Sequence, residues 1–281
     1  MEGLLDFLFI ERYKNKMSEK KICPICMHQM NFIFNAELLN KYNVEYFRCI
    51  ECELVQTEKP YWLDEAYENA IAVSDTGLLQ RNINLSAKMT VLLMLSCLRN
   101  YKFLDIAGGF GVFTRLMRDY GFNYFWHDEY CANIFAKGFE INEEVSLFKV
   151  LSAFEVLEHL VDPVSFINNN ITNHGAEVLI ISTELFRENQ VPPKDWWYYS
   201  FPTGQHISFY SKRTLNKIAE LLDMQFYEAS GLYIFSRKKI KNIFLVKLLL
   251  RGRLPIILSL LYRIFFKGKT EEDSKYLLSK K

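Results

Sequence analysis

The sequence predicts an α/β protein with a parallel central sheet wrapped by helices, preceded by a small four-cysteine unit and followed by a basic helical tail. Between residues 101 and 236, short apolar runs alternate with amphipathic segments, which indicates strands joined by helices. Four of the six cysteines precede that region in two close pairs, and after residue 236 the composition becomes basic and apolar. We expect an N-terminal helix at 1–17, a cysteine unit at 18–60, a helical connector at 61–100, the α/β domain at 101–236 and the tail at 237–281.

The composition is that of a folded protein of near-neutral charge. Half of the 281 residues are hydrophobic and 24% are charged, so a substantial core is expected. The net charge of +1 gives no overall electrostatic reason to bind nucleic acid, and no such partner is expected. The N-terminus carries Glu2 and Asp6 where a secretory signal would be basic, so we expect a cytoplasmic protein with reduced thiols.

The paired cysteines have the spacing of zinc ligands. Two C-x2-C pairs are separated by 22 residues, which suits a tetrahedral ion gripped from two sides. The alternative is a set of four unrelated buried thiols. Four protein ligands would fill the coordination shell, so the expected Zn²⁺ is structural. Cys97 and Cys131 lack partners at ligand spacing and are interpreted as packing thiols. The expected ligands are Cys23, Cys26, Cys49 and Cys52.

The segment from Phe103 to Gly111 has the pattern of a nucleotide-binding loop. An apolar strand leads into a glycine turn, and a helix is expected immediately afterwards, so that backbone and helix N-terminus can approach a cofactor. Asp128 follows the next strand, 17 residues beyond Gly111, where an acid can accept the hydroxyl groups of a ribose. An ordinary turn and a helix N-cap at Asp128 are the alternatives.

These segments, with Ala153–Pro163, resemble the class I methyltransferases that use S-adenosylmethionine. The runs Arg115–Phe122 and Tyr130–Ala136 are similar to a bacterial subgroup that also carries a four-cysteine ribbon and resembles sugar and glycan methyltransferases, over roughly residues 22–233. The resemblance implies a Rossmann-like domain behind a zinc ribbon, with S-adenosylmethionine as the cofactor. It implies that the methionine end lies on the loop, the ribose on Asp128 and the sulfonium beside Phe154 and Glu155. The implied loop residues are Asp105, Ala107, Gly108, Gly109 and Gly111.

The chain departs from the family pattern at two positions. Ala107 stands where the first loop glycine is usual, and Lys149 stands before a strand where an aspartate is usual. The adenine-binding acidic loop is not identifiable between residues 140 and 147.

Two histidines are the candidate catalytic residues, because methyl transfer to a hydroxyl requires a positioned nucleophile and removal of a proton. His159 follows the strand that should flank the methyl group, and its alternative role is to hold the turn at Pro163. His206 lies on a polar turn after four consecutive aromatic residues, Trp196–Tyr199. Those aromatics are interpreted either as a sugar-stacking wall or lid, or as core packing.

The tail suits a surface rather than a membrane span. Residues 237–269 contain ten Lys or Arg and no acid, and the longest uncharged run, Leu254–Tyr262, is much shorter than the roughly 20 residues needed to cross a bilayer. Contact of residues 237–269 with an anionic membrane surface is one interpretation. A helix packed on the domain with a solvated basic face is the other. Gly252 and Pro255 should divide the tail into two pieces.

Three functions are consistent with the sequence. The first is methylation of a sugar, nucleotide-sugar or surface glycan during polysaccharide biosynthesis, at oxygen in preference to carbon. The second is nucleic-acid binding through the zinc ribbon, with a degenerate methyltransferase fold. The third is a non-catalytic scaffold, which Ala107 and Lys149 would support.

Overall fold

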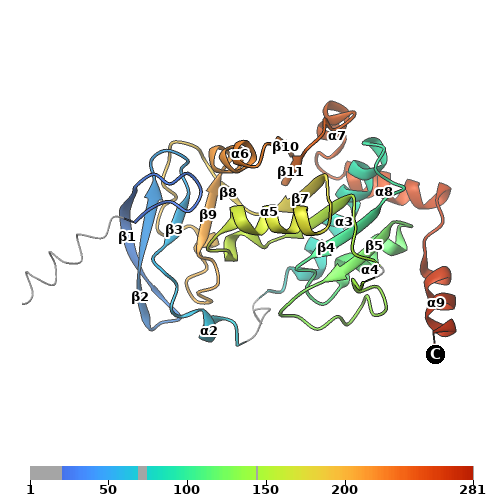
Figure 1. Ribbon diagram of the computed structural model, residues 1–281, viewed down its shortest axis with the longest axis horizontal. Coiled ribbons are helices and arrows are strands. Elements are labelled where there is room, and N and C mark those ends of the chain that lie inside the picture. The colour runs from blue at the N-terminus through green and yellow to red at the C-terminus, as the bar shows by residue number, and fades with distance from the viewer. Residues whose placement is uncertain (1–20, 69–74, 144, 281) are drawn as a thin grey trace, which may run out of the picture.

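The computed structural model describes residues 21–68, 75–143 and 145–280 (Figure 1). The helix expected at 1–17 lies outside these residues. Two β-sheets lie side by side, and the tail helices lie at the far end of the larger one (Figure 1).

The larger sheet has six strands in the order β10-β11-β7-β6-β4-β5. Strands β7, β6, β4 and β5 are parallel, and β11 and β10 close the other edge as an antiparallel hairpin. Side chains on β4, β6 and β7 are almost all buried, as expected of strands covered on both faces. The strands are β4 (Lys102–Ile106), β5 (Asn123–His127), β6 (Val150–Phe154), β7 (Val178–Ser182), β10 (Gln225–Ala229) and β11 (Leu232–Ser236).

Alternate side chains of these strands enter two cores, one on each face of the sheet. One core contains α5 (Pro163–Asn173) and α6 (Lys212–Leu221). The other contains α3 (Leu78–Leu95) and α4 (Val112–Asp119). Helices therefore cover both faces of a mainly parallel sheet, and the predicted Rossmann-like α/β architecture is confirmed.

The smaller sheet joins the cysteine unit to a distant part of the chain. Its strand order is β1-β2-β3-β9-β8. Strand β3 pairs antiparallel with β9 through Val55 with Phe209 and Gln56 with Ser208. The cysteine hairpin and the segment after β7 therefore form one continuous sheet. Its strands are β1 (Met30–Leu38), β2 (Tyr42–Cys49), β3 (Val55–Thr57), β8 (Leu185–Phe186) and β9 (Ser208–Ser211).

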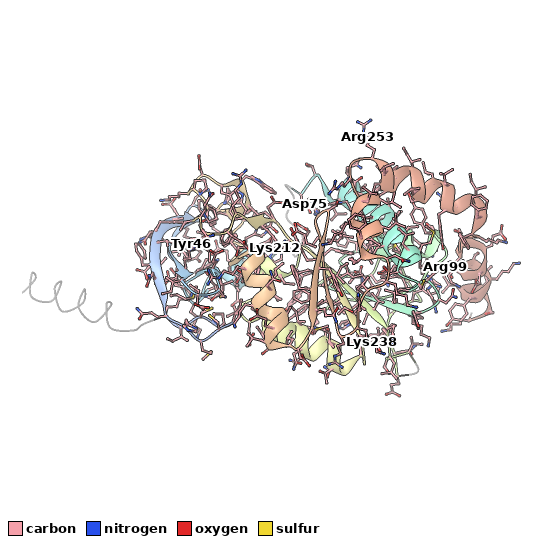
Figure 2. All side chains as sticks on the ribbon, turned by 90° about the horizontal axis from the view of Figure 1, so that it is seen from above. Tyr46, Asp75, Arg99, Lys212, Lys238 and Arg253 are labelled. Atoms are coloured by element: carbon pink, nitrogen blue, oxygen red, sulfur yellow. The ribbon has the colours of Figure 1, made fainter. Side chains whose placement is uncertain are left out.

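A third, mainly aromatic core lies on this smaller sheet. Tyr46 (labelled in Figure 2) and Tyr199 are both fully buried, with ring centroids 5.4 Å apart. Trp62 is also buried, and its indole N–H donates to the Gly204 carbonyl at 2.8 Å. This core fixes the segment that carries His206 against the N-terminal strands.

The helix that an N-cap role for Asp128 would require after the second parallel strand is not formed. Residues 128–139 instead make turns and bends. The Asn133 side chain accepts the Ala136 N–H at 2.9 Å and donates to Glu140 at 2.6 Å, so it satisfies backbone and side-chain groups locally. Such side-chain contacts compete with helical hydrogen bonds, which explains why the helix expectation was wrong here.

The tail forms three helices, α7 (Ile243–Leu249), α8 (Leu254–Phe265) and α9 (Thr270–Ser279). The break at Gly252 agrees with the sequence. Helix α8 packs on α3, and Arg99 (Figure 2) donates to the Tyr262 hydroxyl at 2.7 Å. Asp273 of α9 pairs with Arg118 at 2.6 Å, with both side chains about 4% exposed. Among the described residues no helix is long and apolar enough to cross a membrane.

Candidate active site

The site lies where the strand order of the large sheet reverses. Strand β4 has β5 on one side and β6 on the other, so the chain leaves their carboxyl ends in opposite directions. Parallel α/β sheets bind ligands at such a switch point. A cleft of about 1480 Å³ opens there, lined by the carboxyl ends of β4, β5 and β6, by polar residues of α5 and by residues 197–206.

The glycine loop follows β4 and forms one wall of the cleft. A Cβ on Gly108 would lie 2.6 Å from the Trp126 ring, and one on Gly111 would lie 2.7 Å from the Asn133 amide oxygen. Glycine is therefore required at both positions. Ala107 has a left-handed φ of +60° and is exposed. The methyl group of Ala107 makes this left-handed conformation cost about 1–2 kcal/mol. The loop nevertheless adopts the left-handed turn at this position.

Asp128 closes the glycine loop onto the end of β5. Its carboxylate accepts the Gly109 N–H at 2.8 Å and, through the other oxygen, the N–H groups of Tyr130 and Cys131 at 2.8 Å each. The Trp126 indole donates to the Gly109 carbonyl at 2.9 Å. In the described chain no helix begins at Asp128, so the helix N-cap interpretation is wrong. Asp128 also lines the cleft.

Asp105 lies beneath the loop, 3% exposed. Ser152 donates to one of its carboxylate oxygens at 2.8 Å and Thr114 to the other at 3.4 Å. Burial raises the pKa of Asp105 to about 7, and the negative charge of Asp128 adds to the shift. An acid poised near neutrality at the cleft is therefore ready to gain charge when a cationic group approaches.

Phe154 ends β6 and Glu155 follows it. The Phe154 ring meets Phe113 edge to face at 4.8 Å. Glu155 has a left-handed φ of +54°, and the Ser182 hydroxyl donates to its carboxylate at 2.5 Å. Burial, with the charge of Glu158, raises the pKa of Glu155 to about 7. Both residues line the cleft, next to the glycine loop.

His159 and His206 come together, although 47 positions separate them in the sequence. His159 ends a short 3-10 helix, Leu157–His159, and the two ring centroids are 5.0 Å apart. Each Nδ1 contacts a backbone carbonyl, Gln205 at 3.0 Å for His159 and Tyr198 at 2.7 Å for His206. A carbonyl only accepts, so both Nδ1 atoms carry hydrogen and each Nε2 keeps its lone pair. Burial lowers the pKa of both histidines, which keeps the rings neutral.

Glu158 joins these histidines and was not singled out by the sequence. Its side chain is fully buried, and neither carboxylate oxygen has a hydrogen-bond partner among the described residues. One ligand atom from each of Glu158, His159 and His206 lies within 4.8 Å of the others. The only available signal was the adjacency of an acid and a histidine at the end of a buried strand.

The aromatic run divides between the two roles considered for it. Trp197 is 72% exposed and lines the cleft. Tyr198 is buried, lies against His206 with ring centroids 4.6 Å apart, and its hydroxyl contacts Thr183 at 3.0 Å. Tyr199 belongs to the aromatic core. The run therefore supplies a wall on one side and core packing on the other.

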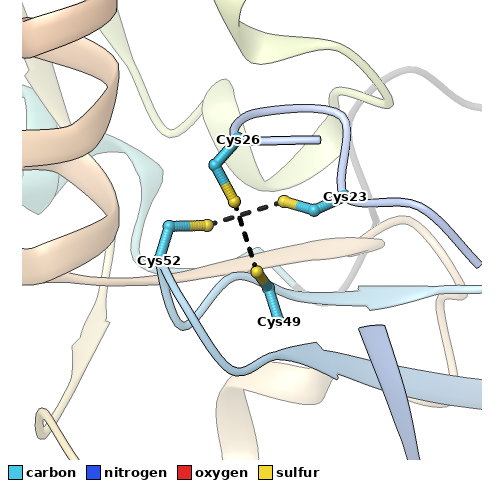
Figure 3. A group of neighbouring side chains, drawn as sticks. All are labelled: Cys23, Cys26, Cys49 and Cys52. Carbon is cyan, nitrogen blue, oxygen red and sulfur yellow. Dashed lines mark hydrogen bonds between the residues drawn. The ribbon is translucent and has the colours of Figure 1, made fainter. Parts of the chain in front are cut away.

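The four ribbon cysteines converge (Figure 3). The Sγ atoms of Cys23 and Cys52 are 3.5 Å apart and those of Cys26 and Cys49 are 3.4 Å apart. A tetrahedral zinc with bonds of about 2.3 Å would space its sulfurs at about 3.8 Å, so the cluster fits the ion with a small expansion. Sulfhydryl groups facing Cys49 hold the pKa of its thiol well below the usual value.

The cysteine cluster also touches the large domain. The Thr214 hydroxyl of α6 donates to the Cys52 carbonyl at 2.8 Å. The other two cysteines differ from each other. Cys131 is half-buried and lines the cleft, whereas Cys97 is exposed, so its interpretation as a packing thiol was wrong. Cys97 lies two residues after α3, in a turn with a left-handed φ of +60°. Its side chain is exposed and does not contribute to the core.

The fold and the glycine-loop geometry together define a class I, S-adenosylmethionine-dependent methyltransferase architecture. The chain belongs to the family described as a methyltransferase domain, whose profile matches residues 79–228, just over half of the 281 residues. The predicted family is thereby confirmed.

Solved structures similar to this chain include several methyltransferases. One is an O-methyltransferase family protein from Burkholderia thailandensis, with 10% identity and a TM-score of 0.44 over 69% of this chain and 66% of that one. Another is human N-acetylserotonin methyltransferase in complex with S-adenosylmethionine, with 11% identity and a TM-score of 0.39 over 63% and 66%. The chain spans less than two thirds of the length of these structures. No curated protein sequence matches it.

Proposed function

We propose that this protein transfers the methyl group of S-adenosylmethionine to a hydroxyl group of a sugar, nucleotide-sugar or surface glycan, as a step in polysaccharide biosynthesis. The observation that carries the proposal is that two neutral histidines, whose Nε2 atoms have no hydrogen-bond partner among the described residues, share one cleft with the glycine loop. Nucleophile activation and cofactor binding can therefore occur side by side.

The cofactor would lie against the loop after β4. Gly108 and Gly111 leave a cradle that a Cβ would fill, so the backbone can approach the cofactor closely. By the family resemblance, residues 105–111 would hold the methionine end, Asp128 the ribose, and Phe154 with Glu155 the sulfonium. When bound, S-adenosylmethionine supplies a methyl group that its sulfonium makes electrophilic.

The protein's own contribution is to orient the acceptor and receive its proton. S-adenosylmethionine held at residues 105–111 would supply the methyl group, and the cleft residues around the two histidines would orient the acceptor oxygen toward it. The hydroxyl proton would pass to the Nε2 atom of His206 or of His159, both of which are neutral and half-buried. A positioned base of this kind contributes about 10²–10⁴-fold to the rate.

The lining of the cleft suits a polyhydroxylated molecule. Trp197 offers an exposed indole face, and elsewhere in the same cleft Asn169 and Asn170 of α5 offer amide groups. Aromatic faces pack on the apolar side of a sugar ring, while amides can pair with its hydroxyl groups. This combination supports a carbohydrate acceptor, and methylation at oxygen in preference to carbon.

The scaffold hypothesis is weakened by the position of Lys149. This residue precedes β6, at the opposite end of the strand from Phe154, and its ammonium pairs with Glu177 at 2.5 Å. Lys149 is not among the residues that line the cleft. The departure from the family pattern at Lys149 therefore lies at the amino ends of the strands, away from the cleft. The absence of a nucleic-acid partner remains a prediction.

The four cysteines are proposed to bind one structural Zn²⁺. They come from two loops that flank β1 and β2, and the cluster contacts α6. The ion would thus fix the ribbon against the large domain, with no open position for chemistry.

The tail is proposed to contact an anionic membrane surface from the cytoplasmic side. The inner face of α8 packs on the domain, but its outer face is apolar, in place of the solvated basic face considered from the sequence. Basic residues lie around it, such as Arg253 (Figure 2) and Arg263, both exposed. Apolar area and flanking positive charge together favour such a surface. The exposed apolar residues of α8 are Leu254, Ile256, Ile257, Leu260, Leu261, Ile264 and Phe265.

Calorimetry with S-adenosylmethionine tests the central proposal. We expect a saturable, one-site binding curve for the purified chain. Release of S-adenosylhomocysteine should then rise above background with at least one member of a panel of nucleotide-sugars. A chain that does not bind S-adenosylmethionine would instead support the scaffold hypothesis.

A further inference from the structure

We propose that Glu158, His159 and His206 bind a divalent transition-metal ion at the acceptor end of the cleft. The three side chains come from the two segments that follow β6 and precede β9, and they offer two imidazole nitrogens and one carboxylate oxygen within 4.8 Å of one another. This site is separate from the four-cysteine cluster.

The two histidines are already oriented as metal ligands. Each donates Nδ1–H to a main-chain carbonyl, Gln205 for His159 and Tyr198 for His206. Histidines that bind metals generally donate their other ring nitrogen in this way, which fixes the tautomer and the ring plane. The rings are tilted 76° to each other with their centroids 5.0 Å apart, and one nitrogen of each ring lies within 4.8 Å of the other ring's nitrogen and of a Glu158 oxygen.

Glu158 supplies the second, independent observation. Its carboxyl group is completely buried, and neither oxygen accepts a hydrogen bond from the described chain. An ionised carboxylate without partners is costly in such a place, and buried charges are normally paired or bound to a metal. A cation between Glu158 and the histidines would satisfy it.

The geometry and donor set indicate the class of ion. Ligand atoms about 2.1 Å from one metal lie roughly 3.0–4.2 Å from each other, so small side-chain rotations would close the observed spacing. Two imidazoles and one carboxylate suit Zn²⁺, Fe²⁺, Co²⁺ or Mn²⁺, whereas Mg²⁺ prefers oxygen ligands. Three protein ligands leave positions open toward the cleft.

These open positions would bind the oxygen of the acceptor. A metal held by Glu158, His159 and His206 would lower the pKa of a hydroxyl group bound to it, and would so make the acceptor oxygen a better nucleophile toward the methyl group. The histidine nitrogens would then serve as ligands in place of proton acceptors. This role rests on the proposed function, but metal binding does not and can be measured alone.

Titration of the full chain with Co²⁺ tests the site. The four-cysteine cluster is first loaded with zinc, and loosely bound metal is then removed with a chelator. We expect about one equivalent of Co²⁺ to bind with visible d–d bands. The intense sulfur-to-cobalt charge-transfer band should be absent, because the ligands are nitrogen and oxygen. Glu158→Gln and His206→Asn should each weaken this binding by about 100-fold or more.

His174→Asn is the matched control. The Nδ1 atom of His174 also contacts a backbone carbonyl, Ser146 at 3.0 Å, but the residue is outside the cluster. This variant should bind Co²⁺ like the unaltered chain. The proposal is overturned if the unaltered chain takes up no Co²⁺ beyond the cysteine cluster, or if Glu158→Gln and His206→Asn, both folded by circular dichroism, bind it equally well. Calorimetry with S-adenosylmethionine reports separately on the proposed function.

Discussion

Val55 pairs with Phe209 across the seam between the cysteine hairpin and the large domain. Next to this pair, the Gln56 side-chain amide of β3 donates to the Ser208 hydroxyl of β9 at 3.0 Å and to the Val161 carbonyl at 2.9 Å. Ser208 is two residues after His206, so the ribbon holds one end of the turn that carries this histidine. The ribbon therefore helps to position the turn that carries His206 at the cleft.

Replacement of Cys49 by Ser should release the zinc and lower the thermal stability of the protein. Cys49 ends β2, next to the β3–β9 ladder, so we expect turnover to fall while the affinity for S-adenosylmethionine stays within about threefold, since the cofactor loop lies on the other sheet. Elemental analysis, thermal unfolding and calorimetry measure the three effects. Less than about half an equivalent of zinc in the unaltered, freshly purified chain would contradict the assignment.

Replacement of Asp128 by Ala should weaken binding of S-adenosylmethionine by about 1–3 kcal/mol. The change removes the proposed ribose acceptor and leaves the N–H groups of Gly109, Tyr130 and Cys131 without their partner. Asp162→Ala is the control, because Asp162 also accepts a backbone N–H, from Ser165 at 3.0 Å, but outside the cofactor loop. An unchanged dissociation constant for Asp128→Ala would limit this residue to turn formation.

Replacement of His206 by Ala should lower turnover by about 10²–10⁴-fold and leave the affinity for S-adenosylmethionine nearly unchanged. The reason is that His206 lies against Tyr198 at the acceptor end of the cleft. His159→Ala is the comparison, since His159 follows the β6 wall and could disturb both ends. Equal turnover in His206→Ala and the unaltered chain would move the role to His159.

The contribution of Asp105 to the stability of the fold should decrease as pH rises from about 4 to 7. Asp105 has an ordinary pKa of 3.8 and a folded pKa of about 7, so in this range the folded state binds more protons than the unfolded state. The contribution is favourable at low pH and is lost as the pH rises through the folded pKa. Asp105→Asn should flatten this dependence, and the exposed Asp195→Asn should not. Thermal unfolding across the pH range gives the comparison.

The double substitution Ile264→Glu and Phe265→Glu should reduce binding to vesicles that contain anionic lipid. These side chains are 73% and 78% exposed, so the change should leave the fold intact. Leu278→Glu, on α9 and 65% exposed, is the control. Vesicle sedimentation at low and high salt checks the prediction, and equal sedimentation of all three proteins at low salt would end the membrane proposal.

Local patterns made the large sheet, the glycine turn and the convergence of the four cysteines predictable. The apolar strand at Phe103, the glycines after it and the two cysteine pairs each depend on residues close together in the sequence. Proline at position 163 marks the start of α5. The preceding residue, Asp162, caps the first turn by accepting the Ser165 N–H.

Contacts between distant segments could not be predicted in the same way. Val55 and Phe209 are 154 positions apart, and no pattern in either segment encodes their register. Glu158 gave no sign that it would be buried beside His206, because burial of an acid depends on the tertiary fold. The missing helix after β5 follows from side-chain hydrogen bonds of Asn133, which compete with a helix that apolar periodicity alone favours.

The Arg118–Asp273 ion pair joins α9 to α4 of the large domain, with both side chains about 4% exposed. The substitution Asp273→Ala, with α9 still in place, would leave the Arg118 guanidinium buried without this carboxylate, at a cost of about 3–5 kcal/mol. That is a large share of the stability of an average domain. The match to the methyltransferase family ends at residue 228, yet buried contacts with the large domain continue 45 residues further, to Asp273. The family match and the packed core therefore end at different residues of this protein.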